Sequence, residues 1–289
     1  MKNKIIIIIG ARGSLGQALC GAFPQALGWD RDEIDITEKK QVNEKITELR
    51  PTVVINAAAY NDVDACEDEK QLALAQKING AAVGYLADVC KNISAVLAHY
   101  STNYVFKGDR LAGYIETDEP SPISNYGLSK LAGEREILSR AGLKFYLIRT
   151  SKLFGEKGKS AVAKENFFDV MLNLSKKQNE IKAVDEELSN FTYTPDLARA
   201  TKSLIAGNYE PGIYHIVNEN PATWCDGARV LFDILGKDVK LKAVGADAFR
   251  RPAKRPRYGI LLNTKLPKLR SYQEALLEYL KNQITNNKN

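Results

Sequence analysis

The sequence predicts an α/β protein, built as a Rossmann-type, doubly wound parallel sheet with a smaller C-terminal lobe for a substrate. Three observations lead to this prediction. The run KIIIII at residues 4–9 is short and β-branched, which is typical of a strand buried on both faces. Similar runs alternate along the chain with stretches that have apolar residues at helical spacing. A glycine-bearing turn joins the first strand to the first helix, as expected of parallel strands with helical crossovers.

The predicted elements follow this alternation through the whole chain. In the first half we expect strands at 4–9, 51–60, 94–106 and 144–155, and helices near 14–23, 72–90 and 125–138. In the second half we expect helices at 166–177, 194–207, 224–236 and 271–284, and strands at 181–184 and 212–217. We place the sheet domain at 1–151 and most of the smaller lobe at 152–289, with the elements of about 192–219 rejoining the sheet.

Composition and charge narrow the function classes. With 289 residues, 44% of them hydrophobic and 26% charged, the chain can bury a full core as a soluble globular protein. The net charge of +6 is too diffuse to indicate a nucleic-acid partner, and no apolar run reaches the length of a membrane span. Four scattered cysteines without CxxC spacing, and only two histidines, favour neither a metal site nor disulfides. We therefore expect a cytoplasmic protein.

The turn GARGSLG after the first strand carries Gly10, Gly13 and Gly16 and opens a helix. Glycines let backbone N–H groups approach a pyrophosphate, and a helix N-terminus offers it partial positive charge. These glycines could serve only a tight turn. However, Asp30 follows at the distance where dinucleotide-binding proteins place an acidic residue, so the pattern predicts an NAD(P)-binding domain over 1–151.

The choice between NADH and NADPH stays open in the sequence. Asp30 favours NAD(H), because a carboxylate accepts hydrogen bonds from the adenosine ribose. Arg12 and Arg31 favour NADP(H), because guanidinium groups neutralise a 2′-phosphate.

Tyr126 and Lys130 lie four residues apart in NYGLSKLAGE, on one face of the predicted helix 125–138. Such a pair also occurs by chance on many amphipathic helices. The segment YSTNYVF places Ser101 and Thr102 near the carboxyl end of the preceding strand, where parallel sheets bind ligands. A hydroxyl, a tyrosine and a lysine there form a proton-transfer unit. We expect the lysine cation to lower the pKa of the tyrosine, which donates a proton to a carbonyl oxygen as hydride reaches its carbon.

The glycine turn, INAAAYNDVDACE, HYSTNYVF, NYGLSKLAGE and LIRTS resemble, in order and spacing, the extended short-chain dehydrogenase/reductases and more narrowly the dTDP-4-dehydrorhamnose reductase family. The likeness is specific from residue 4 to about 151 and weaker beyond. It implies that Tyr126 is the proton donor, Lys130 its partner, and Thr102 the hydroxyl that tunes Tyr126 and contacts the sugar. Together with Tyr126 and Lys130, the expected cofactor-binding residues are Gly10, Gly13, Ser14, Leu15, Gly16, Asp30, Asp35, Ile36, Ala59, Tyr60, Asn61 and Tyr100.

Four departures from the family pattern fall on the substrate side. The family usually has Thr-Asp where this chain has Thr102-Asn103, and a tryptophan that contacts the deoxysugar where Lys152 stands. A Gly-x-Pro-Thr signature reads SNFT at 189–192, and an expected Asn-Ser reads Tyr258-Gly259. An ammonium group in place of an indole removes an apolar contact and adds a charge. We therefore take Asn103 and Lys152 as substrate-binding residues and expect them to alter the choice of substrate.

A basic segment lies at 250–257 and contains Arg250, Arg251, Lys254, Arg255 and Arg257. We expect Arg255 to bind the pyrophosphate of a nucleotide-linked substrate and the other arginines to be solvated. The resemblance also implies Mg²⁺ at an assembly interface, and with it a homodimer. The sequence shows no carboxylate cluster to assign to that ion, so no metal ligand is predicted.

The expected function is NAD(P)H-dependent reduction of the 4-keto group of a nucleotide-linked 6-deoxyhexose, from dTDP-4-dehydrorhamnose to dTDP-L-rhamnose or a close relative. Two alternatives stay open. A sugar-nucleotide epimerase or 4,6-dehydratase would keep the fold, but Asn103-Tyr104 lacks the acidic pair that commonly follows the catalytic threonine of the dehydratases. A non-catalytic subunit resembling the β subunit of methionine adenosyltransferase would explain the substrate-side departures, but it would not need both Tyr126 and Lys130.

Overall fold

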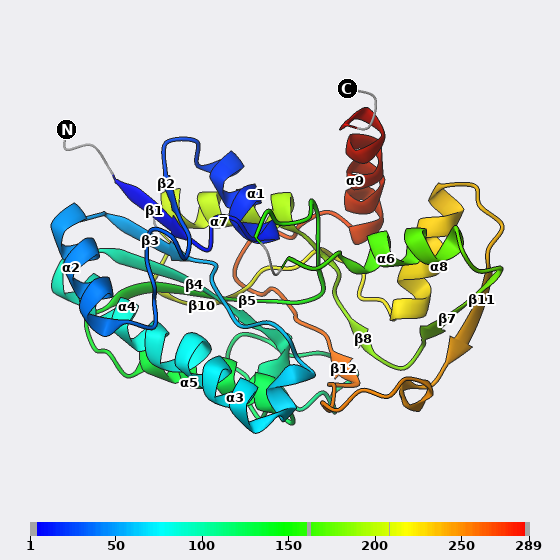
Figure 1. The fold of residues 1–289 in the computed structure, drawn as a ribbon, viewed down its shortest axis with the longest axis horizontal. Helices are drawn as coiled ribbons and strands as arrows, with labels where there is room; N and C mark the ends of the chain where they lie inside the picture. Colours follow the sequence, from blue (N-terminus) through cyan, green and yellow to red (C-terminus); the bar gives the residue numbers. More distant parts are fainter. Residues whose placement is uncertain (1–4, 161–162, 208, 287–289) are drawn as a thin grey trace.

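The computed structural model describes residues 5–160, 163–207 and 209–286. Its main sheet contains six parallel strands in the order β10-β5-β4-β3-β1-β2 (Figure 1). In that order the strands are β10 (Gly212–His215), β5 (Lys144–Thr150), β4 (Val96–Thr102), β3 (Val53–Asn56), β1 (Ile6–Ile9) and β2 (Leu27–Trp29). The predicted doubly wound parallel sheet is confirmed.

The observed strands differ in detail from the predicted ones, and most of them are shorter. β2 has no counterpart among the predicted strands, because two of its three residues are exposed at the sheet edge and form no apolar run. The strand predicted at 51–60 is shorter, since only Val53–Asn56 pairs with its neighbours. The strand predicted from residue 4 begins at Ile6, and residue 4 itself lies outside the described residues.

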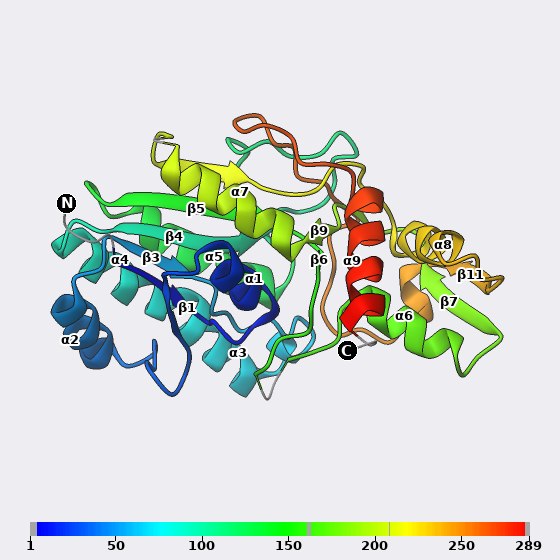
Figure 2. The ribbon, with the colours of Figure 1, turned by 90° about the horizontal axis from the view of Figure 1, so that it is seen from above.

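Helices cover both faces of the sheet (Figure 2). One face carries α1 (Ser14–Ala22) and α7 (Thr194–Ala206), and the other carries α2 (Lys39–Leu49), α4 (Ala82–Asn92) and α5 (Asn125–Leu138). Successive residues of β1 pack to opposite sides. Ile8 joins the core under α1 and α7, whereas Ile7 and Ile9 join the core under α2 and α4. Burial on both faces explains why the run KIIIII is apolar without alternation.

The helix predicted at 72–90 is irregular in its middle. α3 (Glu69–Gln76) runs into a π-helical turn at Lys77–Ala81, which continues as α4. The turn contains the buried residue Asn79, whose side chain bonds the segment that follows β3. Turns of this kind are frequent at functional sites, and this one lies beside the carboxyl edge of the sheet.

Two elements of the second half lie with the main sheet. β10 pairs with β5, and α7 packs against α1. α7 begins at Thr194 with Pro195 in its first turn, where the missing N–H of proline leaves no hydrogen bond unmade. The division of the chain at residue 151 stays a prediction.

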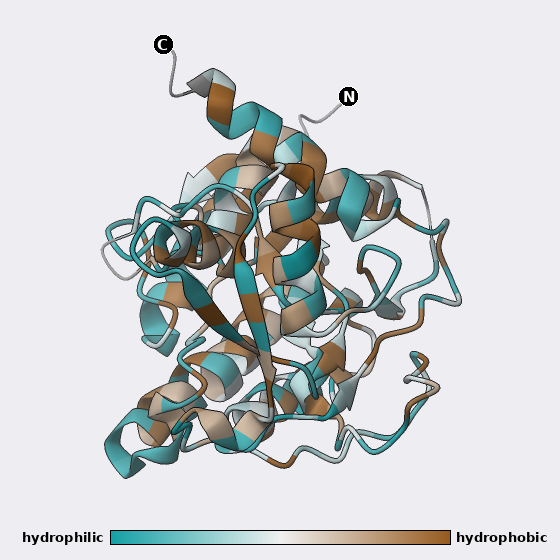
Figure 3. Cartoon of the chain, turned by 90° about the vertical axis from the view of Figure 1, so that its right-hand side faces the viewer, coloured by the Kyte–Doolittle hydropathy of each residue, from teal (hydrophilic) through white to brown (hydrophobic). Residues whose placement is uncertain are grey.

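The smaller lobe lies at the end of the molecule opposite β2 (Figure 1). It contains α6 (Phe167–Ser175), α8 (Trp224–Ile234), α9 (Tyr272–Asn286) and the parallel pair β7 (Glu180–Val184) and β11 (Lys240–Val244). Seen from this end, its helices carry both hydrophobic and hydrophilic residues (Figure 3), as amphipathic helices do around a shared core. That core is largely aromatic and includes Phe154, Phe168 and Phe191.

Two short parallel pairs lie between the lobe and the main sheet (Figures 1 and 2). They are β6 (Leu153–Phe154) with β9 (Thr192–Tyr193), and β8 (Leu188–Ser189) with β12 (Tyr258–Gly259). Among residues 5–160, 163–207 and 209–286, no helix is both long enough and apolar enough to cross a membrane.

Candidate active site

The order of the strands places a crevice between β1 and β3. From β1 the chain moves outward to β2, and it then returns to the other side of β1 as β3. In open parallel sheets, ligands bind outside the carboxyl ends of the strands at such a reversal. The glycine turn follows β1 and the segment 57–61 follows β3, so both lie at this crevice.

The glycine turn brings backbone close to backbone. Gly10 has a φ of 81°, and a Cβ at this position would lie 2.7 Å from the amide nitrogen of Ala58. A Cβ on Gly16 would overlap the carbonyl oxygen of Gly10. Gly13 is the N-cap of α1, and no described side chain caps this helix. The first N–H groups of α1 therefore have no side-chain cap, as is typical of a helix N-terminus that binds a phosphate.

Asp30 holds the turn in place. Its carboxylate accepts N–H bonds from Arg12 at 3.0 Å and from Arg31 at 2.9 Å. The Arg12 guanidinium lies 2.6 Å from the carboxylate of Asp32 and is about half exposed. The carboxylate of Asp30 and the two arginines thus lie together where β1 and β2 end, beside the glycines.

A segment from the loop after β6 covers the glycine turn, which the sequence did not predict. The Lys159 amide donates to the Arg12 carbonyl oxygen at 2.7 Å, and the Gln17 side chain donates to the Lys157 carbonyl oxygen at 2.9 Å. Between them, a Cβ on Gly158 would lie 2.9 Å from the Ser14 nitrogen. Only glycine fits this contact at the start of α1.

The remaining expected cofactor residues lie along the same edge. Ile36 is buried, and the exposed Asp35 accepts bonds from the amide and hydroxyl of Thr37. The backbone of Tyr60, between Ala59 and Asn61, is bonded on both sides by Asn79, which accepts from its N–H and donates to its carbonyl oxygen at 2.9 Å each. Sequence reasoning missed Asn79, although an asparagine inside an apolar helical stretch is a signal that could have found it.

The structure brings Thr102 and Tyr126 together. Thr102 ends β4, and Tyr126 is the second residue of α5, whose N-cap Ser124 accepts the Gly127 N–H at 3.2 Å. The Tyr126 ring meets the edge of Tyr104 at a centroid distance of 5.4 Å. The Thr102 side chain lies close enough to Tyr126 to lower the pKa of its phenol, while the Thr102 hydroxyl donates to Oδ1 of Asn103 at 3.3 Å. The two hydroxyls therefore form one polar pair in an otherwise packed surrounding.

Lys130 is one helical turn further along α5 and is almost fully buried. Its ammonium donates to the Tyr100 carbonyl oxygen at 2.7 Å. The phenol of Tyr100 lies on the opposite face of the sheet, 2.7 Å from the Thr201 hydroxyl of α7. Only the backbone of Tyr100 thus reaches Lys130.

The pKa of Tyr126 corrects one expectation. Burial raises the pKa of this phenol, Tyr104 raises it further, and the hydrogen bond with Thr102 opposes both. Burial lowers the pKa of Lys130 to about 8, whereas Glu134 raises it. The expectation that Lys130 makes Tyr126 unusually acidic is wrong for the folded chain by itself, because desolvation dominates and the ammonium is bonded to Tyr100.

Residues 3–285 match the family model described as RmlD substrate binding domain. The chain belongs to the RmlD family. It is 36% identical to a dTDP-4-dehydrorhamnose reductase of Streptomyces griseus over 94% of this chain and 91% of the relative. It is 32% identical to the spore coat polysaccharide biosynthesis protein SpsK of Bacillus subtilis over 95% of this chain and 96% of that protein. The family predicted from the motifs is confirmed.

Solved structures of the RmlD family have the same fold. The dTDP-4-dehydrorhamnose reductase from Bacillus anthracis in complex with NADP superposes with a TM-score of 0.89 at 32% identity, covering 96% of this chain and 99% of that chain. The dTDP-4-dehydrorhamnose reductase from Clostridium acetobutylicum gives a TM-score of 0.88 at 35% identity with the same coverage.

The four departures from the RmlD pattern contact one another as two pairs. Asn103 is buried, and its amide donates to the Gly259 carbonyl oxygen at 3.1 Å. A Cβ on Gly259 would overlap that amide nitrogen. In the second pair, Lys152 lies over the ring of Phe191, and the Thr192 N–H donates to the Lys152 carbonyl oxygen at 3.1 Å. The pairs are linked because Gly259 pairs with Ser189 between β12 and β8.

The ammonium group of Lys152 lies among backbone carbonyl oxygens and aromatic rings. Its ammonium donates to the carbonyl oxygens of Glu187 at 3.0 Å and Ala222 at 2.9 Å. It also lies 4.3 Å from the ring centroid of Trp224 and 4.8 Å from that of Phe191, within the range of cation–π attraction. Burial lowers the pKa of Lys152 to about 7, while the carboxylates of Glu187 and Asp226 raise it.

The basic segment is more structured than the sequence predicts. Arg255 forms a bidentate ion pair with Asp64, with nitrogen–oxygen distances of 3.1 and 2.7 Å. Arg251 was expected to be solvated, but it pairs with the buried carboxylate of Glu187 and is only one-fifth exposed. Arg251, Arg255 and Glu187 line a cavity of about 390 Å³.

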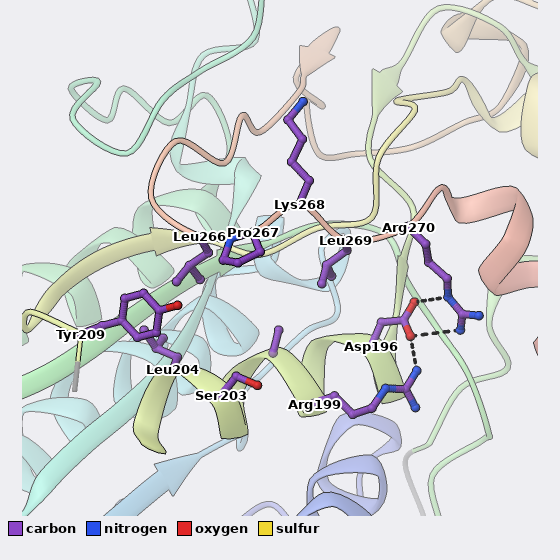
Figure 4. A pocket seen from close by; sticks show the side chains of 11 residues that line it. Asp196, Arg199, Ser203, Leu204, Tyr209, Leu266, Pro267, Lys268, Leu269 and Arg270 are labelled. Atoms are coloured by element: carbon purple, nitrogen blue, oxygen red, sulfur yellow. Dashed lines mark hydrogen bonds and ion pairs between the residues drawn. The ribbon is translucent and has the colours of Figure 1, made fainter. Parts of the chain in front are cut away.

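A larger cavity of about 470 Å³ lies between α7 and the segment 266–270 (Figure 4). There Arg199 and Arg270 converge on the buried carboxylate of Asp196, with Arg270 at 2.9 and 3.0 Å. This cavity lies on the α7 face of the sheet and contains none of the predicted site residues. In the described ranges, no three histidine, cysteine or acidic residues gather in a group that could hold a metal ion.

Proposed function

We propose that the chain is an NAD(P)H-dependent reductase of the 4-keto group of a nucleotide-linked 6-deoxyhexose, dTDP-4-dehydrorhamnose or a close relative. The observation that carries this proposal is the paired Thr102 and Tyr126, with Lys130 one turn on, at the sheet edge that also holds the glycine cradle. Relatives named dTDP-4-dehydrorhamnose reductase support it, as does one named dTDP-4-keto-6-deoxy-D-glucose reductase from Streptomyces niveus at 32% identity.

The polar groups of the chain suit proton donation. When bound, the reduced nicotinamide supplies the hydride. Tyr126 then donates its phenolic proton to the 4-keto oxygen, while Thr102 fixes the direction of the phenol. Because burial raises the pKa of Tyr126, the phenol stays protonated at neutral pH. A protonated phenol is the form that a reductase needs.

The cofactor is NADPH or NADH, with NADP(H) favoured. Arg12 and Arg31 stand beside Asp30, whose carboxylate already accepts two backbone N–H groups. The complex of the Bacillus anthracis relative with NADP supports the same choice. On the family resemblance we also propose a cytoplasmic setting without a nucleic-acid or membrane partner, and a homodimer, which sedimentation of the purified chain tests.

Reduction of 4-keto nucleotide sugars is the direct test. The purified chain is mixed with NADPH or NADH and a small panel of dTDP- and UDP-linked 4-keto sugars, and the absorbance of the reduced nicotinamide is followed. We expect oxidation of NADPH with at least one 4-keto-6-deoxy sugar. Tightly bound NAD⁺ that copurifies, with no net oxidation, would instead indicate an epimerase. No turnover with any sugar, together with stable binding to another protein, would indicate a non-catalytic subunit.

Lys152→Met tests the substrate side separately. We predict that KM for the nucleotide sugar rises roughly tenfold, because loss of a charge-assisted hydrogen bond is worth about 1.5 kcal/mol or more and the ammonium ties Glu187 to Ala222 beside the proposed sugar position. KM for NADPH should not change. Exposed Lys40→Met serves as the control, since Lys40 only pairs loosely with Glu44 on α2. Equal KM values for the sugar in the wild type and in Lys152→Met would remove Lys152 from the substrate side.

A further inference from the structure

His99 is a buried residue of β4 that lies between β3 and the proposed active site. Its side chain is fully buried. On one side, Nδ1 is 3.0 Å from the Nδ2 atom of Asn56, which ends β3. On the other side, Nε2 is 3.5 Å from the ammonium nitrogen of Lys130. The imidazole thus bridges the end of β3 to the lysine of the proton-transfer unit.

The orientation of Asn56 fixes which nitrogen of His99 carries the proton. The Ala58 N–H donates to Oδ1 of Asn56 at 3.1 Å, so the amide oxygen faces Ala58 and Nδ2 faces the histidine. An amide nitrogen can only donate a hydrogen bond, and Nδ1 of His99 must therefore accept it. The neutral imidazole then has its proton on Nε2, directed toward Lys130.

In this tautomer, two hydrogen-bond donors face each other. A lysine ammonium is a donor only, and Nε2–H of His99 is a donor as well. While Lys130 is charged, the two groups cannot form a hydrogen bond, and the imidazole N–H dipole opposes the charge. An uncharged Lys130 amine would accept from Nε2–H. The contact therefore favours the uncharged amine over the ammonium.

We propose that His99, with its proton placed on Nε2 by Asn56, is a positioning residue that limits the pH range in which Lys130 stays charged, and so sets the alkaline limit of the reaction. This proposal rests on the proposed reductase, in which the charged Lys130 is the partner of Tyr126. It adds two residues, His99 and Asn56, that need not touch substrate or cofactor.

His99 is a titratable neighbour of Lys130 whose Nε2 faces the ammonium. The other groups that face Lys130 are either paired elsewhere or uncharged at neutral pH. Glu134 from α5 raises the pKa of Lys130, but its carboxylate is already paired with Arg149 at 2.7 Å and bonded by Ser101. Tyr126 from α5 and the Tyr100 carbonyl from β4 carry no charge at neutral pH. Burial and the Lys130 charge both lower the pKa of His99 well below its ordinary value, so the imidazole stays neutral.

The tautomer can be measured without any substrate. Nitrogen-15 NMR of the labelled full-length chain distinguishes the two neutral tautomers and the imidazolium. The chain has two histidines, and the variants His99→Gln and His215→Gln assign their signals. We expect His99 to carry its proton on Nε2 at neutral pH. A proton on Nδ1, or a charged ring, would overturn the proposal even if the chain proves to be an active reductase.

The pH dependence of kcat/KM tests the consequence. Activity should fall as the pH rises through the pKa of Lys130. In His99→Gln the amide oxygen can turn toward the ammonium, and in Asn56→Asp the carboxylate draws the His99 proton to Nδ1, so that Nε2 accepts from Lys130. Both variants should move the alkaline limit upward by about one pH unit, which corresponds to about 1.4 kcal/mol.

A matched control separates this effect from simple loss of packing. His215→Gln replaces the other buried histidine, which lies on β10 beside Phe106. We expect it to lower the melting temperature without moving the alkaline limit. An unchanged limit in folded His99→Gln and Asn56→Asp would overturn the proposal, as would an equal shift in His215→Gln. If both site variants fail to fold, the nitrogen-15 spectrum of the wild type still shows which nitrogen of His99 carries the proton, and so still tests the proposal. Failure of every sugar to react would refute the reductase but leave the tautomer result intact.

Discussion

Tyr126→Phe is expected to lower turnover by roughly 100-fold or more while leaving dinucleotide binding nearly unchanged. The substitution keeps the ring that packs against Tyr104 and Cys66 but removes the hydroxyl beside Thr102. Without that hydroxyl, no group of the chain at this position can give a proton to the 4-keto oxygen. Steady-state kinetics with NADPH measures turnover, and quenching of protein fluorescence measures cofactor affinity.

Tyr146→Phe is the matched control for this experiment. Its phenol donates to the Tyr209 carbonyl oxygen at 2.9 Å on the α7 face of the sheet. We expect near-normal turnover and a stability loss of about 1 kcal/mol, which is typical of one hydrogen bond. Full turnover in a correctly folded Tyr126→Phe protein would show that another group supplies the proton.

Glu134→Gln is expected to lower the free energy of unfolding by about 3–5 kcal/mol. Glu134 and Arg149 are both almost completely buried, and two parallel bonds of 3.0 and 2.7 Å join them. Without the carboxylate, the buried guanidinium keeps its charge but loses its charged partner, while it retains the face of Phe106 and the Glu116 carbonyl oxygen. Urea-induced unfolding measures the loss.

Two further variants test whether the loss of stability comes from a buried unpaired charge. Glu44→Gln removes one partner of the exposed pair Lys40–Glu44, and we expect a change within about 0.5 kcal/mol. Replacing both buried partners, with Glu134→Leu and Arg149→Met together, should lose much less than the single change, because no unpaired charge is left. A small loss in Glu134→Gln, or additive losses in the double variant, would contradict this account.

The main sheet and the glycine cradle could be predicted because their signals are local. A β-branched run, a glycine turn and a helical stretch are adjacent in the sequence, so the prediction of each element supports the prediction of its neighbour. β2 escaped prediction because its exposed residues have no apolar pattern. The π-helical turn around Asn79 also escaped it, because no proline interrupts the helical stretch that runs from α3 through the turn into α4.

The contacts of Lys152, Asn103 and Arg255 could not be predicted because their partners are far apart in the chain. Lys152 bonds Ala222, and Asn103 bonds Gly259. Arg255 was expected to be free for a ligand, yet its partner Asp64 comes from the loop after β3. The sequence shows residue types at each position, but only folding shows which opposite charges lie within reach of each other.

Because the two pairs are linked, a change toward the common family pattern at one of these positions would disturb the residue that it contacts. A serine at position 259 would drive its Cβ into the Asn103 amide, and an indole at position 152 would displace the ammonium that bridges two carbonyl groups. Neighbours in contact change stability non-additively, so each single reversion should be harmful even where the combined change is tolerated. A change of this chain to the common family pattern, in evolution or by engineering, would therefore require several substitutions together, because the effect of each depends on the others.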